Sequence, residues 1–388
     1  MAYISDDNAA GQKLKKSATQ SEKTLLAPTA ERLRAEASAE ELQTIHMIDV
    51  LASEQNISLS FLQQLLALPK NNAVKYLHAK ARKAVEQVYG DKIFLRGLVE
   101  ITSFCRNNCN YCGIRRGNRT LERYRMTPET IMACCKDGYG YGMRTFVLQG
   151  GEDPWWIDDR LVDLVAAIRS RFPDCAITLS MGERPRESYQ RLYDAGANRY
   201  LLRHETADES HYHYLHPNEM SFQNRMQCLQ WLKEIGYQVG CGFMVGSPGQ
   251  TAETLLKDLQ FIRTFRPQMV GIGPFVATQH TPFADSPNGS VETTLRLLSV
   301  IRLLHPHVLL PSTTALGSLH PLGRELGILA GANVLMPNLS PVENRGLYNI
   351  YDNKICIGDS IDHCYDCLSV RMESTGRRIV VERGDFLG

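Results

Sequence analysis

Apolar residues follow two different spacing patterns along this chain, and the pattern changes near residue 90. Over residues 38–89 they recur at spacings of three and four, as in AEELQTIHMIDVLASEQ, which is the period of an amphipathic helix. A second helix is predicted to begin at Ser58, and a third to run from Asn72 to Tyr89. We expect these three helices to cap the bottom of the domain that follows.

From residue 93 onward, short β-rich runs alternate with longer amphipathic segments. Eight runs have the length and composition of strands: 93–102, 144–149, 176–181, 199–204, 239–246, 269–275, 308–314 and 332–338. The segments between them, such as RLVDLVAAIRSRF, read as helices, and glycine often closes them, as at Gly196 and Gly236. Eight such units predict an α/β fold of the (β/α)8 TIM-barrel type. An open doubly wound sheet or a partial barrel is the alternative.

The pattern divides the chain into four parts. These are a polar, flexible tail (1–36), a helical N-terminal cap (37–90), the barrel (91–340) and a C-terminal segment (341–388). With 388 residues, 43% of them hydrophobic and 22% charged, the chain can bury the large core that one such barrel needs.

Charge and hydropathy argue against two classes of partner. The formal net charge is +1, so the composition gives no sign of a nucleic-acid partner. We find no apolar stretch of about 18 residues and therefore expect no membrane span. The first residues, MAYISDDNAAGQKLKKSATQSEK, lack the apolar core of a secretory signal, so we expect a cytoplasmic protein.

Cysteine usage points to metal chemistry. Eleven cysteines make an odd number for a disulfide framework, and in a reducing compartment clustered cysteines more often bind metal. Six of them form two tight groups. The other five are expected to be buried small hydrophobic residues: Cys134, Cys135, Cys175, Cys228 and Cys241.

The first group follows the first predicted strand directly. Cys105, Cys109 and Cys112 have the spacing C-x3-C-x2-C. Three thiolates on one loop can bind three irons of a 4Fe-4S cubane and leave the fourth iron open to a small molecule. Zinc, which prefers four closed ligands, fits this spacing poorly. Tyr111, just before the last cysteine, is typical of the loop of radical S-adenosylmethionine (radical-SAM) enzymes.

That resemblance implies a specific cofactor chemistry. S-adenosyl-L-methionine (SAM) would chelate the open iron through its amino and carboxylate groups. One electron from the cluster would then cleave a C–S bond and release a 5′-deoxyadenosyl radical. The protein would supply orientation and a dry cavity.

Other unusual polar residues also stand at the carboxyl ends of predicted strands, which meet on one face of a barrel. Gln149, Gly150, Gly151 and Glu152 follow the second strand; the glycines let backbone approach a ligand, and their amide and carbonyl groups could hold the methionyl amine. Radical-SAM enzymes carry a similar element there. Ser180 ends the third strand.

Three charged residues near the fourth strand are further candidates. Glu205 can accept from a ribose or an ammonium group, Arg203 can bind a carboxylate, and Arg225 could pair with the methionine carboxylate. An ordinary ion pair is the alternative for each. Small or flexible side chains end the last two strands, where they either line a pocket or pack: Thr313, Thr314 and Met336.

The second group of cysteines lies near the C-terminus. Cys356, Cys364 and Cys367 have the spacing C-x7-C-x2-C, which suggests a second iron–sulfur site. Two alternatives stay open. His363 could be a rival ligand, with zinc as the metal, or the thiols could be unliganded at the surface.

Over about residues 90–370 the chain resembles the HydE family, the radical-SAM maturases of FeFe-hydrogenase. The segments that carry the resemblance are FCRNNCNYCGIRRGN, ERYRMTPE, VLQGGEDPWW, SMGERPRE, YLLRHETAD, MVGSPGQT, MVGIGPF, PSTTALG, GANVLMPNLSP and CIGDSIDHCYDC. The resemblance implies a barrel with the SAM cluster at its top and an accessory 2Fe-2S or 4Fe-4S cluster on the distal cysteines. It also implies a role in assembling the diiron part of the H-cluster.

The resemblance assigns residues to each role. Contacts to SAM are implied for Ser180, Glu205 and Arg225. The residues implied around the substrate are Gln149, Arg203, Thr313, Thr314, Met336, Tyr348 and Tyr351. That substrate is a small organometallic molecule, a cysteine-bound iron carrying CO and cyanide, attacked at sulfur. The implied partners are the other two maturases, a radical-SAM tyrosine lyase and a GTPase scaffold.

Three alternatives remain. Biotin synthase and methylornithine synthase resemble the chain in fold and first cluster. Biotin synthase carries further cluster ligands inside its barrel, which residues 203–206 do not show, and methylornithine synthase lacks the distal cysteines. A non-enzymatic iron–sulfur carrier would need no SAM pocket, and Gln149–Asp153, Glu205 and Arg225 argue against it.

Overall fold

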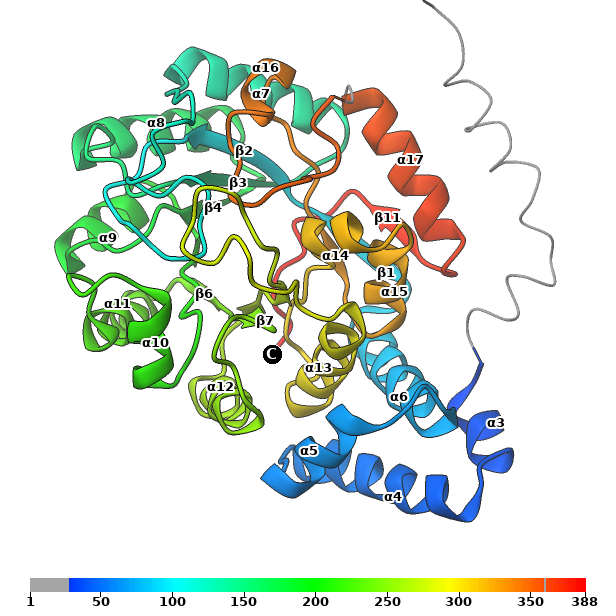
Figure 1. The fold of residues 1–388 in the computed structure, drawn as a ribbon. Helices are drawn as coiled ribbons and strands as arrows, with labels where there is room; N and C mark the ends of the chain where they lie inside the picture. Colours follow the sequence, from blue (N-terminus) through cyan, green and yellow to red (C-terminus); the bar gives the residue numbers. More distant parts are fainter. Residues whose placement is uncertain (1–27, 359–360) are drawn as a thin grey trace, which may run out of the picture.

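A computed structural model of the chain describes residues 28–358 and 361–388. Parallel strands form a ring that is surrounded by helices, and the N-terminal helices lie outside this ring (Figure 1). The helices are α3 (Ala30–Ala35), α4 (Ala39–Glu54), α5 (Leu59–Ala67), α6 (Asn72–Tyr89), α7 (Pro128–Gly140), α8 (Asp158–Arg171), α9 (Arg186–Asp194), α10 (Glu209–Leu215), α11 (Phe222–Ile235), α12 (Ala252–Phe265), α13 (Val291–Leu304), α14 (Thr314–Leu319), α15 (Gly323–Leu329), α16 (Val342–Arg345) and α17 (Ile361–Glu373).

The strands are β1 (Lys92–Leu95), β2 (Gly97–Thr102), β3 (Thr145–Gly150), β4 (Ala176–Ser180), β5 (Arg199–Leu201), β6 (Gln238–Cys241), β7 (Met244–Val245), β8 (Met269–Val270), β9 (Gly273–Pro274), β10 (Val334–Leu335) and β11 (Arg378–Val380). Six of them form a parallel sheet in the order β2-β3-β4-β5-β6-β8.

Further parallel pairing closes this sheet into a barrel. Leu309 bridges to Met269 of β8, and Pro311 bridges to Val334 of β10. β10 in turn pairs with β1, which leads directly into β2. The barrel prediction is therefore confirmed, with two differences. The predicted strands 93–102, 239–246 and 269–275 are each divided into two, and the predicted seventh strand, 308–314, is present only as isolated bridges.

Burial explains why the predicted strands read as continuous apolar runs. Every residue of β2 is buried, as expected for parallel strands covered on both faces. The helices outside bury one stripe each; α8, for example, buries Leu161, Leu164, Val165 and Ile168. Among the residues that the structure describes, none of the helices combines the length and apolarity needed to span a bilayer.

The N-terminal helices form where the sequence predicts them. α4 begins with a capping box in which Ser38 and Glu41 satisfy each other's backbone N–H groups. These helices pack mainly on α12 and α13, at the side of the barrel. Only the end of α6 reaches the bottom, where the Tyr89 hydroxyl donates to the His307 carbonyl at 2.6 Å, so the expected cap differs from the structure.

The predicted flexible tail also differs from the structure at its end. Residues 30–35 form α3, which packs on α6 and buries Ala30 and Leu33. Residues 1–27 of the predicted tail lie outside the described residues.

The bottom of the barrel is filled by the C-terminus, which the sequence did not predict. β11 pairs in parallel with β1, and the chain then passes under the strands to end near the centre of the ring (Figure 1). The fully buried Arg199 side chain donates from Nη2 to the carbonyls of Arg383 and Gly384 at 3.1 Å and to the Asp385 carboxylate at 2.7 Å. Residues 383–385 therefore close the bottom of the barrel, whereas Leu387 and Gly388 are exposed.

Candidate active site

The first three cysteines lie together at the carboxyl end of β2. The loop that carries them, residues 103–126, crosses the top of the barrel, and Cys105, Cys109 and Cys112 are all half-buried there. The Arg123 guanidinium holds this loop, because it donates to four of its backbone carbonyls at 2.5–3.1 Å: Ser103, Ile114, Arg115 and Asn118. Protein contacts therefore set the shape of the loop.

The electrostatics of the three thiols suit a cluster of metal ions. Burial raises the pKa of all three thiols, and the neighbouring thiols add to this effect for Cys109 and Cys112. The pKa of Cys112 rises to about 12. Three such thiols cannot all ionise without positive charge among them, which bound iron would supply. In the described part of the chain, no three His, Cys, Asp or Glu side chains surround a site for one metal ion.

Gly151 is required by the cysteine loop itself. A Cβ at this position would lie 2.3 Å from the Phe104 carbonyl oxygen and 2.7 Å from the Cys105 Cβ. At Gly151 the end of β3 thus approaches the cysteine loop closely, whereas the predicted approach of these glycines to a ligand stays a prediction.

An ion pair with a buried carboxylate, that of Asp153, joins the same two segments. Arg125 binds Asp153 in a bidentate manner, with N–O distances of 2.7 and 2.9 Å, and the Thr102 hydroxyl donates to Asp153 at 2.8 Å. The Arg125 guanidinium also lies 3.8 Å from the centre of the Phe104 ring. Bidentate pairs fix geometry, so this contact orients the cysteine loop on the strands.

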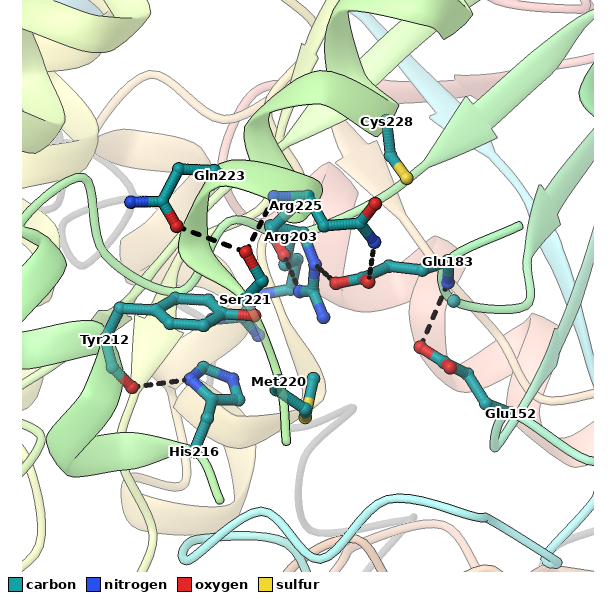
Figure 2. Close-up of polar contacts among 12 residues, drawn as sticks. Glu152, Glu183, Arg203, Tyr212, His216, Met220, Ser221, Gln223, Arg225 and Cys228 are labelled. Carbon is teal, nitrogen blue, oxygen red and sulfur yellow. Dashed lines mark hydrogen bonds and ion pairs between the residues drawn. The ribbon is translucent and has the colours of Figure 1, made fainter. Parts of the chain in front are cut away.

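Glu152 is held by protein groups. Its carboxylate accepts from Arg106 Nε and from the Glu183 backbone N–H, both at 3.0 Å. Glu183 in turn accepts from Arg225 Nε at 2.6 Å, and Arg225 Nη1 donates to the Arg203 carbonyl at 2.5 Å. Figure 2 shows the contacts from Glu152, after β3, through Glu183 to Arg225 on α11. A direct role of Glu152 toward a cofactor stays a prediction.

Arg203 and Glu205 retain unused polar capacity. Arg203 Nη2 stands 3.1 Å from Glu205 Oε2, yet neither atom has a hydrogen-bond partner, and Arg203 Nε is also buried without one. Buried polar groups are normally paired. Glu205 also has φ +64°, a conformation that non-glycine residues hold mainly at functional sites. These two side chains therefore fit a site for a polar ligand.

Residues 346–356, which we call the mouth strap, lie over the top of the barrel. The Gly113 N–H donates to the Ile350 carbonyl at 3.0 Å, and the Gln279 N–H donates to Asp352 at 2.8 Å. The contact at Gly113 is so close that a Cβ there would lie 2.1 Å from the Asn349 carbonyl oxygen. The strap is therefore attached beside the last cysteine of the loop.

The strap brings the predicted substrate residues toward the barrel. Tyr348 is buried, and its hydroxyl accepts from Gln149 Nε2 at 3.3 Å. Burial raises the pKa of Tyr348, with Glu100 and Cys112 adding to the effect. The hydroxyl of Thr313, at the N-cap of α14, is buried without a partner. The remaining predicted positions, all half-buried, are Thr314 at the start of α14, Met336 after β10 and Tyr351 in the strap.

A buried ion pair that the sequence analysis missed lies beneath the strap. Lys354 donates to one oxygen of the Glu100 carboxylate, and Asn338 Nδ2 donates to the other at 2.8 Å. Glu100 is 1% exposed. Burial raises the pKa of its carboxyl, and Lys354 opposes that rise. This pair fixes the strap to β2.

His216 was also missed, and it holds Tyr111 in place. Its Nδ1 lies 2.9 Å from the Tyr212 carbonyl (Figure 2), which can only accept, so Nε2 accepts from the Tyr111 hydroxyl at 3.2 Å. Burial lowers the pKa of His216 to about 3. The ring is therefore neutral at pH 7, as this pair of bonds requires.

The buried neutral His216 makes stability depend on pH. Its folded pKa lies below the unfolded value of about 6.5, so the unfolded chain binds the extra proton and stability falls as pH drops below 6.5. We expect His216 to account for a loss of about 2 kcal/mol between pH 6.5 and 5. Urea unfolding of the His216→Gln variant should show a shallower loss over this range, whereas replacing the exposed His213 should leave the slope unchanged.

The distal cysteines also come together. The Cys364 thiol hydrogen-bonds with the Cys356 thiol, a contact that, with burial, raises the pKa of Cys364. Arg324 Nη2 lies 3.6 Å from the Cys356 sulfur. Cys367 follows one turn later on α17 and is exposed. The side chain of His363, the predicted rival ligand, lies outside what the structure describes.

The predicted site residues thus stand at one end of the barrel. Of the distal cysteines, Cys356 ends the strap, and Cys364 and Cys367 lie on α17 after it. Sequence reasoning missed Glu100, Lys354 and His216. A charged residue within an apolar strand run was the one available signal, at Glu100. The partners of these residues are too distant in sequence to be paired by spacing.

Comparison with known proteins places the chain among radical-SAM proteins. Residues 99–262 match the Radical SAM superfamily. The chain is 42% identical to the [FeFe] hydrogenase maturase subunit HydE of Thermotoga maritima over 317 residues, which cover 82% of this chain and 90% of that protein. It is 30% identical to 3-methylornithine synthase of Methanosarcina barkeri over 282 residues, covering 72% and 79%. A crystal structure of methylornithine synthase superposes with a TM-score of 0.75 at 26% identity, covering 86% of this chain and 97% of that one.

Proposed function

This chain belongs to the HydE family of radical-SAM maturases of FeFe-hydrogenase, and we propose that the mouth of its barrel cleaves SAM to modify a small organometallic precursor of the H-cluster. The observation that carries the proposal is the meeting, at one end of the barrel, of three half-buried cysteines with the Arg203–Glu205 ion pair, in which Arg203 Nε is buried without a hydrogen-bond partner.

We assign Cys105, Cys109 and Cys112 to the 4Fe-4S cluster. When bound, this cluster supplies the electron that cleaves SAM to methionine and the 5′-deoxyadenosyl radical. The chain's own contribution is to hold the thiols in a fixed loop, through Arg123 and the Arg125–Asp153 pair.

We assign the SAM molecule to polar groups around that loop. Glu205 would accept from the ribose or the ammonium, and Ser180 at the end of β4 would contribute a hydroxyl. Arg225, already ion-paired with Glu183, would direct its remaining donors to the carboxylate. Gln149, Gly150, Gly151 and Glu152 would border the methionyl group from the end of β3.

The substrate would lie deeper in the barrel, under the mouth strap. Tyr348 and Gln149 form one wall, and the Thr313 hydroxyl has no other partner. Arg203 would bind an anionic group there, and Thr314, Met336 and Tyr351 would complete the lining. A cysteine-bound iron carrying CO and cyanide suits such a site, because the strap excludes water from the radical. The other two maturases, a radical-SAM tyrosine lyase and a GTPase scaffold, would supply the precursor and receive the product.

We also assign a second iron–sulfur cluster to Cys356, Cys364 and Cys367. Two thiols in contact beside a guanidinium, at Arg324, favour an anionic cluster. A Cys105→Ser/Cys109→Ser/Cys112→Ser protein, reconstituted anaerobically, should retain iron and an iron–sulfur absorption spectrum. Zinc alone, or no metal, would contradict this assignment.

A methylornithine synthase activity is the second candidate, since that enzyme shares the fold and 30% of aligned residues. Two assays separate the candidates. Reconstituted protein with dithionite and SAM should release 5′-deoxyadenosine, which a mere iron–sulfur carrier would not. In a hydrogenase maturation assay lacking only this chain, adding the chain should restore hydrogenase activity. If hydrogenase activity is not restored and the protein forms 3-methylornithine instead, the second candidate is favoured.

A further inference from the structure

The residue between Arg203 and Glu205 points away from the barrel mouth. His204 is fully buried, whereas its two neighbours form the ion pair at the mouth. Its ring packs between Phe243 and Phe261, with centroid distances of 6.0 and 4.8 Å. The segment therefore presents two side chains to the mouth and anchors a third in the core.

The hydrogen bonds of His204 define its tautomer. Nδ1 accepts from the Gly242 N–H at 3.3 Å, so the proton must be on Nε2, which lies 3.3 Å from Asp258 Oδ1. Asp258 lies within α12 and is 0% exposed. The same oxygen accepts from the Ala207 N–H at 2.5 Å. One buried carboxylate thus holds the segment on both sides of Glu205.

Burying the Asp258 carboxylate in the core is energetically unfavourable, because the charge loses its hydration. Apolar side chains of similar size often stabilise a fold as well or better, and Asp258 Oδ2 has no hydrogen-bond partner. Burial raises the pKa of Asp258, which reports the same unfavourable environment. The hydrogen bonds that Asp258 accepts explain its placement, because they support the strained backbone at Glu205.

Glu205 is the residue that needs support. Its φ of +64° is disfavoured for a side chain with a Cβ, and its own N–H bonds only to the Gly242 carbonyl, at 3.0 Å. Such conformations persist when surrounding contacts over-determine them. The contacts at His204 and Ala207 do so, because they fix the backbone immediately before and after Glu205.

We propose that Asp258 and His204 are positioning residues, which hold Glu205 in its left-handed conformation and thereby set the affinity for SAM. The inference rests on the role proposed above for Glu205. Without Asp258, the segment would sample conformations that aim Glu205 elsewhere. If only a fraction of the molecules hold Glu205 in the binding conformation, the apparent dissociation constant for SAM equals the intrinsic constant divided by that fraction.

The test is steady-state cleavage of SAM by the reconstituted enzyme. Asp258→Ala should raise the KM for SAM about tenfold, with kcat at saturating SAM changed less than about threefold. Asp258→Asn keeps an acceptor oxygen for both donors and should restore most of the affinity. His305→Phe is the matched control: His305 is equally buried, at the bottom of the barrel, and bonds the Pro267 carbonyl at 3.1 Å. This variant should lose stability without a change in KM.

A double-mutant cycle with Glu205→Gln separates the possible failures. If Asp258 acts through Glu205, the double variant should have a KM close to that of Glu205→Gln alone. Additive increases, or an unchanged KM in Asp258→Ala while Glu205→Gln raises it, would overturn the positioning role and leave the proposed function intact. An unchanged KM in Glu205→Gln would instead remove the SAM contact itself, and the positioning role with it.

Discussion

Replacing Cys105 by serine should abolish SAM cleavage, lowering the rate of 5′-deoxyadenosine formation by more than about a hundredfold. Mutating a residue that only hydrogen-bonds to a metal ligand already lowers metal affinity or activity by about 10–100-fold. Loss of a direct ligand should lower it further. A hydroxyl in place of the thiol would leave two sulfurs, Cys109 and Cys112, for the cluster. The measurement is chromatographic quantification of 5′-deoxyadenosine after anaerobic reconstitution, with dithionite as the reductant.

The matched control for this variant is Cys364→Ser. The distal cysteines lie at the end of the mouth strap and on α17, and their loss should spare most of the cleavage activity. The folded state should survive in Cys105→Ser as well, because Arg123 and Arg125 hold the loop without using the thiols. Equal losses in the two variants would contradict the division into a catalytic and an accessory group.

Lys354→Met should destabilise the protein by about 3–5 kcal/mol at pH 7, the usual effect of leaving one buried charge without its partner. Glu100 would keep only the Asn338 amide as a side-chain donor. With Lys354 gone, the pKa of Glu100, already raised by burial, should rise further. Equilibrium unfolding in urea measures the loss.

The pH dependence of that loss has a definite sign. The folded state would hold the Glu100 proton more tightly than the unfolded chain, in which glutamate titrates near pH 4.3. The variant should therefore approach wild-type stability below this pH and fall behind as pH rises toward 7. A Glu100→Gln/Lys354→Met variant removes the stranded charge and should recover most of the stability. A pH-independent loss would show that packing of the lysine stem dominates.

The features predicted from sequence are those that local chemistry fixes. The cysteine loop needs three thiols at short spacing, which the sequence displays directly. The helix α6 (Asn72–Tyr89) is equally local, because its apolar stripe and its N-cap, Asn71, lie in one continuous segment. The eight strand runs were recognisable because buried parallel strands are apolar throughout. The seventh forms only bridges at Leu309 and Pro311, since Pro311 has no N–H to donate to the ladder.

What the sequence could not provide are contacts between distant residues. Lys354 reaches Glu100 over 254 positions, Tyr111 meets His216 over 105, and His204 meets Asp258 over 54. Nothing in the local pattern links these pairs, because their proximity follows from closure of the barrel. The substrate residues of the mouth strap came from family resemblance for the same reason.

The C-terminal residues beneath the strands have a consequence for synthesis. Arg199 leaves the ribosome 186 residues before Asp385, which at typical translation speeds is a delay of roughly 10–40 s. Throughout that interval the nascent barrel has an open lower end and a guanidinium still in water. Closure of the lower end around Arg199 therefore has to wait until residues 383–385 have been synthesised.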